Sequence, residues 1–175
     1  MRQSFKLAAA IVSLGLAASP AMAEQLCGAD IAQEGNMRVA QVGGLSAACE
    51  IDSICSVTLA TGDDMRVDME RASLDGSWLI RFSGTSSIDT GAGIDLVFNG
   101  SDETRVAPEF LISSEDKKTV RVDDDVSQIM VTTMTESKTM MSTVQFVGGK
   151  KINMDVNVSE LGKALEWVDC AQAKQ

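Results

Sequence analysis

The sequence predicts a mainly β fold: an antiparallel β-sandwich or barrel-like sheet with a short C-terminal α-helix. Three observations lead to this prediction. Several segments alternate apolar and polar residues, turn-forming pairs of residues separate these segments, and the apolar spacing changes to a helical period near the C-terminus. Alternation with period two is typical of half-buried strands, because successive side chains of a strand point to opposite faces of the sheet.

The strand predictions follow the alternation along the chain. Clear period-two segments occupy residues 55–59, 65–69, 78–82, 94–98 and 152–158. Two further segments, 129–134 and 140–147, are rich in β-favouring residues and carry apolar side chains on both faces. Because strands covered on both faces lose their polar alternation, we expect these two segments to be more central strands.

Turn chemistry separates the predicted strands. Gly62-Asp63, Asp75-Gly76, Asn99-Gly100 and Gly148-Gly149 all contain residues that tolerate positive φ. The Gly148-Gly149 pair predicts a tight hairpin between two long strands. The run Asp123-Asp124-Asp125 predicts another exposed bend.

The end of the chain has helical spacing. Leu161, Ala164, Leu165 and Val168 recur at intervals of three and four residues, and Ser159 is the expected N-cap. We expect a helix of about three turns that packs across an open end or a face of the sheet.

Residues 1–23 have the pattern of a cleaved secretory signal peptide. Arg2 and Lys6 precede an apolar run over residues 7–18, and Ala21-Met22-Ala23 forms a small-x-small cleavage site. The run is shorter than the ~20 apolar residues that cross a bilayer, so we expect no membrane span in the mature protein. The expected location is the periplasm of a Gram-negative bacterium, or the outside of the cell after secretion.

The remaining residues, 24–175, are predicted to form a single β-rich domain held by disulfides. Loss of Arg2 and Lys6 leaves 13 basic and 25 acidic residues, a formal net charge of −12. Such a field repels nucleic acids and anionic lipid headgroups, so we expect no nucleic-acid partner.

Four cysteines remain in the mature chain, and disulfides persist in an oxidising compartment. Cys49 and Cys55 flank a five-residue segment centred on Asp52, so a hairpin there places the two cysteines opposite each other. Cys27 and Cys170 then pair by elimination. We expect both bridges to be structural, since the chain has no C-x-x-C motif to favour a redox-active pair.

Several kinds of chemistry lack their usual residues. The chain contains no histidine and no tyrosine, which removes Ser-His-Asp and Cys-His nucleophile systems and the commonest metal ligand. No glycine pattern typical of phosphate binding occurs. We therefore predict a non-enzymatic protein with no catalytic residues, no cofactor and no metal.

Two features admit a metal-binding interpretation beside a structural one. Asp123-Asp124-Asp125 supplies the oxygen ligands that Ca²⁺ prefers, but lacks the spacing of a calcium loop, which favours a solvated turn. Thioethers bind Cu(I), but the strand positions of the methionines favour core packing. These methionines include Met130, Met134, Met140, Met141 and Met154.

The chain resembles the invasion-associated locus B family of exported α-proteobacterial proteins in the order of its landmarks. These are the close pair Cys49 and Cys55 before an extended strand, the amphipathic strands at 78–82 and 93–98, and Gly149 followed by the alternating strand 152–158. Ser159, Leu161, Gly162, Ala164 and Leu165 then match the family's ending. Family members carry a second close cysteine pair mid-chain, which this chain lacks. The resemblance implies a periplasmic or surface-associated β-sandwich without known catalysis, linked in some relatives to host-cell invasion.

Taken with the composition, these observations favour a protein that acts through protein–protein contact in the cell envelope or on a host cell. The alternative is a periplasmic carrier of a small ligand or a metal. A deep apolar pocket with convergent polar groups is typical of a carrier, whereas an open apolar patch is typical of an interaction protein.

Overall fold

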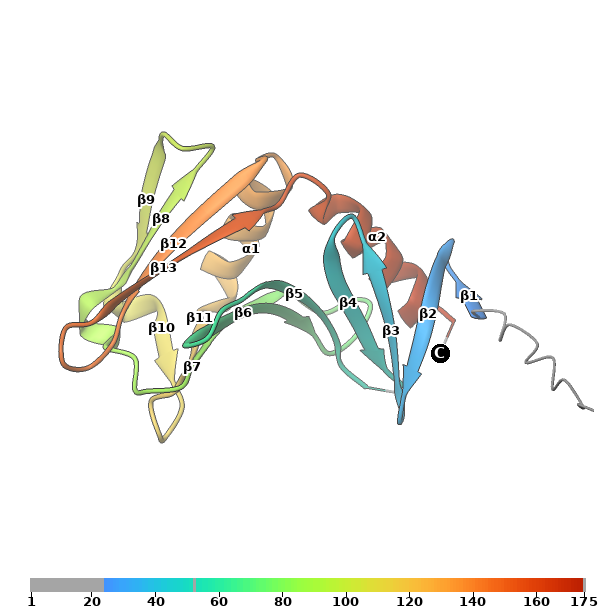
Figure 1. Cartoon of the computed structure of the whole chain (residues 1–175), viewed down its shortest axis with the longest axis horizontal. Helices are drawn as coiled ribbons and strands as arrows, with labels where there is room; N and C mark the ends of the chain where they lie inside the picture. The colour runs from blue at the N-terminus through green and yellow to red at the C-terminus, as the bar shows by residue number, and fades with distance from the viewer. Residues whose placement is uncertain (1–23, 52, 175) are drawn as a thin grey trace, which may run out of the picture.

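The computed structural model describes residues 24–51 and 53–174. The predicted signal segment, residues 1–23, lies outside the described residues. Two antiparallel sheets and two α-helices make up the fold (Figure 1), so the predicted mainly β, sandwich-like class is confirmed, and the sheets do not close into a barrel.

The larger sheet has nine strands in the order β1-β2-β3-β4-β5-β6-β7-β11-β10. Its strands are β1 (Glu24–Leu26), β2 (Ala29–Glu34), β3 (Met37–Val42), β4 (Leu45–Glu50), β5 (Cys55–Thr61), β6 (Met65–Arg71), β7 (Leu79–Gly84), β10 (Leu111–Ser113) and β11 (Thr119–Val122). Strands β1 to β7 are neighbours in sequence order, because short turns join them.

The smaller sheet has four strands in the order β13-β12-β8-β9. They are β8 (Ile94–Phe98), β9 (Asp102–Val106), β12 (Thr139–Gln145) and β13 (Lys151–Asn157). Short 3₁₀ turns, η1 (Thr90–Ala92) and η2 (Pro108–Phe110), lie in the connections between the sheets.

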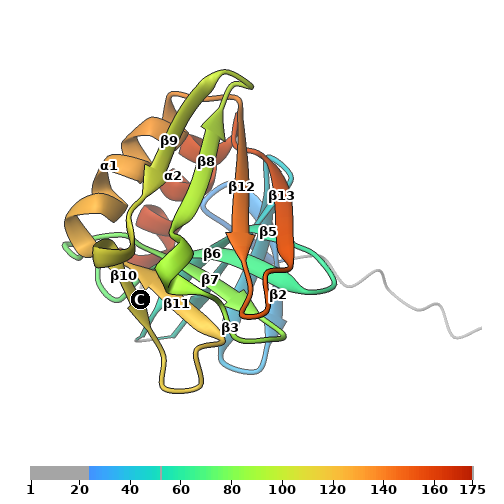
Figure 2. The same ribbon diagram turned by 90° about the vertical axis from the view of Figure 1, so that its left-hand side faces the viewer.

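Both helices and the smaller sheet lie on the same side of the curved nine-stranded sheet (Figures 1 and 2). Helix α1 (Asp124–Thr135) contacts β7, and α2 (Leu161–Gln172) contacts β3, β4 and β5. The packing of α2 across a sheet face confirms the sequence-based expectation. The buried side chains between these layers form one apolar cluster that draws on both sheets and both helices.

The predicted alternating strands are all present. Segment 94–98 is β8, and segments 55–59 and 65–69 fall within β5 and β6. Segment 152–158 matches β13 except for Val158, and segment 78–82 matches β7 except for Trp78. In β8 the burial follows the alternation: Ile94, Leu96 and Phe98 are buried, while Asp95 is exposed. The predicted turn at Asn99-Gly100 joins β8 to β9 with both residues at positive φ, 52° and 76°.

The strand prediction for residues 129–134 is wrong, because these residues belong to helix α1. Asp123 caps this helix: its side chain accepts a hydrogen bond from the backbone N–H of Asp125. Asp124 and Asp125 then lie in the first turn, where negative charge favours the helix dipole. The expected exposed bend at Asp123-Asp124-Asp125 is therefore the start of a helix.

The predicted N-cap of the C-terminal helix is also wrong. The N-cap is Glu160, whose side chain makes no capping hydrogen bond. The hydroxyl and backbone N–H of Ser159 instead donate to the side-chain oxygen of Asn157, at 2.6 and 3.1 Å. Ser159 thus stabilises the turn that leaves β13 instead of the first turn of α2.

The two ends of the described chain are joined through α2. Cys27 and Cys170 form a disulfide with their Cα atoms 5.9 Å apart. One turn earlier in the helix, the indole N–H of Trp167 donates to the backbone carbonyl of Leu26 at 2.9 Å. Figure 1 shows the C-terminal end of the chain beside β1 and β2.

Candidate interaction surface

The cysteines belong to the framework of the fold. All four are paired, Cys27 with Cys170 and Cys49 with Cys55, and none is free. Cys49 and Cys55 lie directly opposite each other in the register of β4 and β5, and both are fully buried. These are the two pairs that the sequence predicts.

The acidic run considered as a calcium site is engaged in helix capping. Asp123 binds the N–H of Asp125, and Asp124 forms an ion pair with Arg121 at 3.0 Å. Within residues 24–51 and 53–174, no group of three or more histidine, cysteine, aspartate or glutamate side chains is placed to hold a metal ion.

The methionines considered as copper ligands divide into two groups. Met130, Met134, Met140 and Met154 are buried in the apolar cluster, as expected for core positions. Met141 is half-buried and belongs to the opposite face of β12, which the core does not cover. It therefore belongs to a surface.

That surface is the outer face of the four-stranded sheet, the face turned away from the core. Sheet register aligns its side chains in rows across the four strands. One row is Glu103, Val97, Met141 and Asp155; the next is Arg105, Asp95, Thr143 and Asn153. Alternation positions these residues, because the same strands direct their other side chains into the core.

Three adjoining hollows make this outer face concave in places. A groove of about 710 Å³ runs from the Gly100 turn across Val97 and Met141 to Asn157. A second, of about 470 Å³, shares Val97 with the first and extends along β9. A third, of about 160 Å³, shares Asp95 and Arg105 with the second. Neighbouring hollows share lining residues and so adjoin one another, and we refer to the three together as the depression.

The depression lies on one sheet instead of between two layers. The residues that line its largest part come from β8, β12, β13 and the adjoining turn. A second groove of comparable size, about 690 Å³, follows β2 and β3 on the nine-stranded sheet. Both are grooves along sheet surfaces, unlike the enclosed pocket expected of a carrier.

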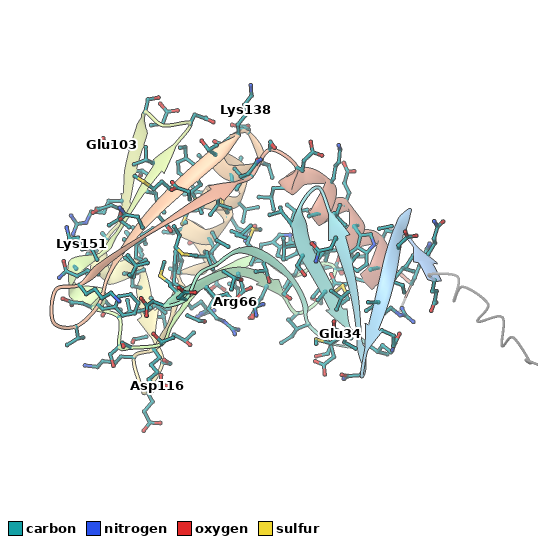
Figure 3. The ribbon with its side chains drawn as sticks, in the orientation of Figure 1. Glu34, Arg66, Glu103, Asp116, Lys138 and Lys151 are labelled. Carbon is teal, nitrogen blue, oxygen red and sulfur yellow. A yellow bond between two sulfur atoms is a disulfide. The ribbon has the colours of Figure 1, made fainter. Side chains whose placement is uncertain are left out.

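The outer face has an apolar centre and a charged border. Val97 and Met141 are both half-buried and adjacent in the register, whereas Glu103, Arg105, Lys151 and Asp155 are exposed around them. Figure 3 shows Glu103 toward one end of the sheet and Lys151 toward the other. An apolar centre surrounded by polar residues is the usual composition of a protein–protein interface.

Most polar groups at the middle of this face satisfy one another. The hydroxyl of Thr143 donates to the side-chain oxygen of Asn153 at 2.9 Å, and Arg105 lies 3.7 Å from Asp95 and also donates to the carbonyl of Ala92. Among the described residues, Glu103, Lys151 and Asp155 take part in none of the ion pairs. Three border charges are thus available to a partner.

The two carboxyl groups whose pKa values are lowered, those of Asp64 and Asp116, lie away from this face. A hydrogen bond from Lys150, reinforced by its charge, lowers the pKa of Asp64 in the β5–β6 turn. Backbone and side-chain hydrogen bonds from Lys118 and Ser114 lower the pKa of Asp116 in the β10–β11 turn. Both shifts favour the ionised form, which suits charge pairing in turns instead of proton transfer.

Of the outer-face residues, the sequence singles out Met141 alone, as one of the methionines considered as copper ligands, and it predicts no protein-binding site there. The alternation does indicate which residues of each strand face outward. In 94–98 and 152–158, the polar residues between the buried apolar ones are exposed, and the two strands lie in the same sheet. What the alternation lacks is the strand order, which brings β8, β12 and β13 together although about 40 residues separate the first two.

No family model, no curated protein and no solved structure matches this chain. Among the described residues, no helix has both the length and the apolar character needed to cross a bilayer.

Proposed function

We propose that this protein is an exported, non-enzymatic binding protein that contacts another protein through the outer face of its four-stranded sheet. The expected setting is the bacterial envelope or the surface of a host cell, as the resemblance to the invasion-associated locus B family implies. Export is supported by the signal-like segment 1–23 and by two disulfides, which persist in oxidising compartments.

The single observation that carries the binding proposal is the composition of the outer face. Val97 and Met141 form an apolar centre, and Met is one of the residues enriched in interfaces. The unpaired charges Glu103, Lys151 and Asp155 at its border would orient a partner more than they would add affinity.

A carrier of a small molecule is the second candidate, because the groove of about 710 Å³ on this face has the volume of a ligand site, although it is open along the sheet surface. A carrier and an interaction protein would use the same face differently. A small molecule would occupy the groove over Met141, whereas a protein would also cover Glu103 and Asp155 at its border.

The test is site-specific photocrosslinking in the cells that make the protein. A photoreactive side chain at Thr143, in the middle of the face, should yield a crosslinked product larger by the mass of a protein. The same probe at Thr132, an exposed position of α1, is the matched control and should give no such product.

Met141→Lys places a charge at the apolar centre without entering the core, so it should abolish the Thr143 crosslink while the circular dichroism spectrum stays unchanged. A small-molecule adduct in native mass spectrometry, lost in Met141→Lys, would replace the interaction role with the carrier role. Equal crosslinking from Thr143 and Thr132 would refute the proposed surface.

A further inference from the structure

In the part of the chain that the structure describes, the two open sheets have four edge strands, and only one of them is long. Strands β1 and β10, at the edges of the nine-stranded sheet, have three residues each. In the four-stranded sheet, β9 has five residues and four of them are exposed, while β13 has seven. Short or heavily charged edges discourage pairing with another chain, so β13 is the edge with the least protection.

Two further features that block an edge, proline and a β-bulge, are absent from strand β13. It contains no proline, its pairing with β12 runs without a bulge from Lys151 to Asn157, and its inward side chains, Ile152, Met154 and Val156, are all apolar. Among the described residues, no further strand pairs with it.

The hydrogen-bonding pattern shows which residues face the open edge. Two backbone hydrogen bonds flank the ladder between β12 and β13. The N–H of Phe146 donates to the carbonyl of Lys150, and the N–H of Val158 donates to the carbonyl of Lys138. Since hydrogen-bonded pairs alternate in an antiparallel ladder, the even-numbered residues bond to β12. Lys151, Asn153, Asp155 and Asn157 therefore direct their backbone groups outward.

The charges of these outward residues are self-complementary. Lys151 and Asp155 are both exposed on the same face and, among the described residues, neither has an ion-pair partner. Four residues of strand separate them by roughly 13 Å, too far for a bridge within the strand. A second copy running antiparallel would bring each opposite the other.

We propose that two copies of this protein pair through β13, antiparallel and with the two-fold axis at Asn153. Lys151 then lies opposite Asp155 of the partner subunit, and Asp155 opposite Lys151 of the partner subunit. The outward backbone groups of the three central residues form about six hydrogen bonds across the axis. The product is a continuous eight-stranded sheet.

The charges select this register over its neighbour. With the axis at Met154, the outward backbone groups would still pair, but Lys151 would face Asn157 of the partner subunit, and Asp155 would face Asn153. Only the axis at Asn153 places both charges directly opposite their counterions, where cross-strand pairs are strongest. It also joins the two outer faces side by side. Lys151 and Asp155 are then engaged by the second copy, and Glu103 is the border charge that stays free to orient a different partner.

The test measures the mass of the purified mature protein in solution by sedimentation equilibrium. The wild type should be a dimer. Asp155→Lys and Lys151→Asp each place like charges opposite each other twice, so each should weaken the dimer roughly tenfold or more. The double variant Lys151→Asp/Asp155→Lys restores both pairs and should return the dissociation constant to the wild-type range.

Mixing the Lys151→Asp and Asp155→Lys variants gives the most discriminating result. The first is acidic at both positions 151 and 155, and the second is basic at both. Heterodimers should therefore form although neither variant dimerises alone. Glu103→Lys is the matched control: it makes the same charge change in the same row at the opposite edge, and should remain dimeric. A monomeric wild type, or single variants as dimeric as Glu103→Lys, would overturn the proposal.

Discussion

The guanidinium of Arg71 lies 4.7 Å from the centre of the Trp78 ring. Arg71 is at the end of β6 and is buried although it is charged. Its remaining donors reach α2: one bonds Asp169 at 2.5 Å, and two bond the side-chain oxygen of Gln172. A single side chain thus connects the nine-stranded sheet to the last helix.

Arg71→Ala should lower the free energy of unfolding by about 2–3 kcal/mol. It removes a cation–π contact and charge-assisted hydrogen bonds, and it leaves Gln172 without its donor. Urea denaturation followed by tryptophan fluorescence measures the change, because Trp78 reports directly on the contact. Arg121→Ala is the control: its pair with Asp124 is exposed and should contribute less than about 0.5 kcal/mol. Equal effects of the two substitutions would contradict this account of Arg71.

Replacing either of two buried serines by alanine should change the free energy of unfolding, but in opposite directions. Ser142 of β12 is fully buried, and its hydroxyl has no hydrogen-bond partner among the described residues. Removing it should stabilise the protein by up to about 1 kcal/mol. Ser127 of α1 is equally buried, but it donates to the carbonyl of Val122 and accepts the N–H of Ile80. Ser127→Ala should therefore destabilise by about 1–3 kcal/mol.

Thermal unfolding of the two serine variants checks this contrast in one experiment, with each variant serving as the control for the other. If Ser142→Ala lowers the midpoint as far as Ser127→Ala does, the Ser142 hydroxyl has a partner after all.

The two disulfides should differ in their contribution to stability. Cys27–Cys170 spans 143 residues of sequence and Cys49–Cys55 only 6. On the chain-entropy model, the first restricts the unfolded chain by about 5 kcal/mol and the second by about 2 kcal/mol. The variant with serine at positions 27 and 170 should lose more stability to guanidinium than the variant with serine at 49 and 55. The reverse order would show that the buried hairpin bridge contributes mainly through the folded state.

The ion pair of Lys150 and Asp64 should make part of the stability depend on pH. The two side chains meet at 2.7 Å, and the hydrogen bond and charge of Lys150 hold the pKa of Asp64 below the usual value of an aspartate. A carboxyl group with a depressed pKa in the folded state stabilises above its unfolded pKa, and this contribution disappears as the pH falls through the folded value.

Asp64→Asn should therefore destabilise the protein at neutral pH, and the difference from wild type should shrink below about pH 4. Urea titrations over a pH series measure it. Asp63→Asn, at the exposed neighbouring position, should leave stability unchanged across the series. A difference for Asp64→Asn that persists in acid would assign the effect to packing instead of charge.

The strands could be predicted from sequence where one face is buried and the other is exposed to solvent. In β8 and β13 the alternation maps directly onto burial, because each of these strands has a solvent-exposed outer face. Strands β1 to β4 were not predicted, since their apolar residues are mostly alanine and valine, with weak contrast to their neighbours. The turns between these strands do contain an indication in the sequence, because each has glycine where the chain adopts a positive φ, at positions 28, 35, 43 and 44.

Helix α1 shows how local propensity misled the prediction. Its β-branched residues and threonines favour strands, yet Met130 and Met134 lie one helical turn apart and both are buried. The cap residue Asp123 and the two acids after it mark the start of the helix, but an acidic run of this kind is also typical of an exposed bend. Tertiary packing outweighs a propensity difference of a few tenths of a kcal/mol per residue.

The outer face of the four-stranded sheet could not be assigned from sequence for a different reason. Its rows join residues from separate strands, such as Glu103 and Asp155, and only the order of strands in the sheet brings them together. Alternation predicts that a residue faces outward, but not which other residues share its face.

The link between the two ends of the chain has a consequence for folding. Strands β1 to β7 can pair in order as the chain emerges into the compartment where it folds, because each neighbour follows within a few residues. The start of this sheet is nevertheless linked to the last helix: Cys27, directly after β1, forms its disulfide with Cys170, and the indole N–H of Trp167 donates to the Leu26 carbonyl. A chain that stops before Cys170 therefore keeps Cys27 as a reactive thiol next to β1, so the pairing of these two cysteines reports whether α2 has docked on the sheet.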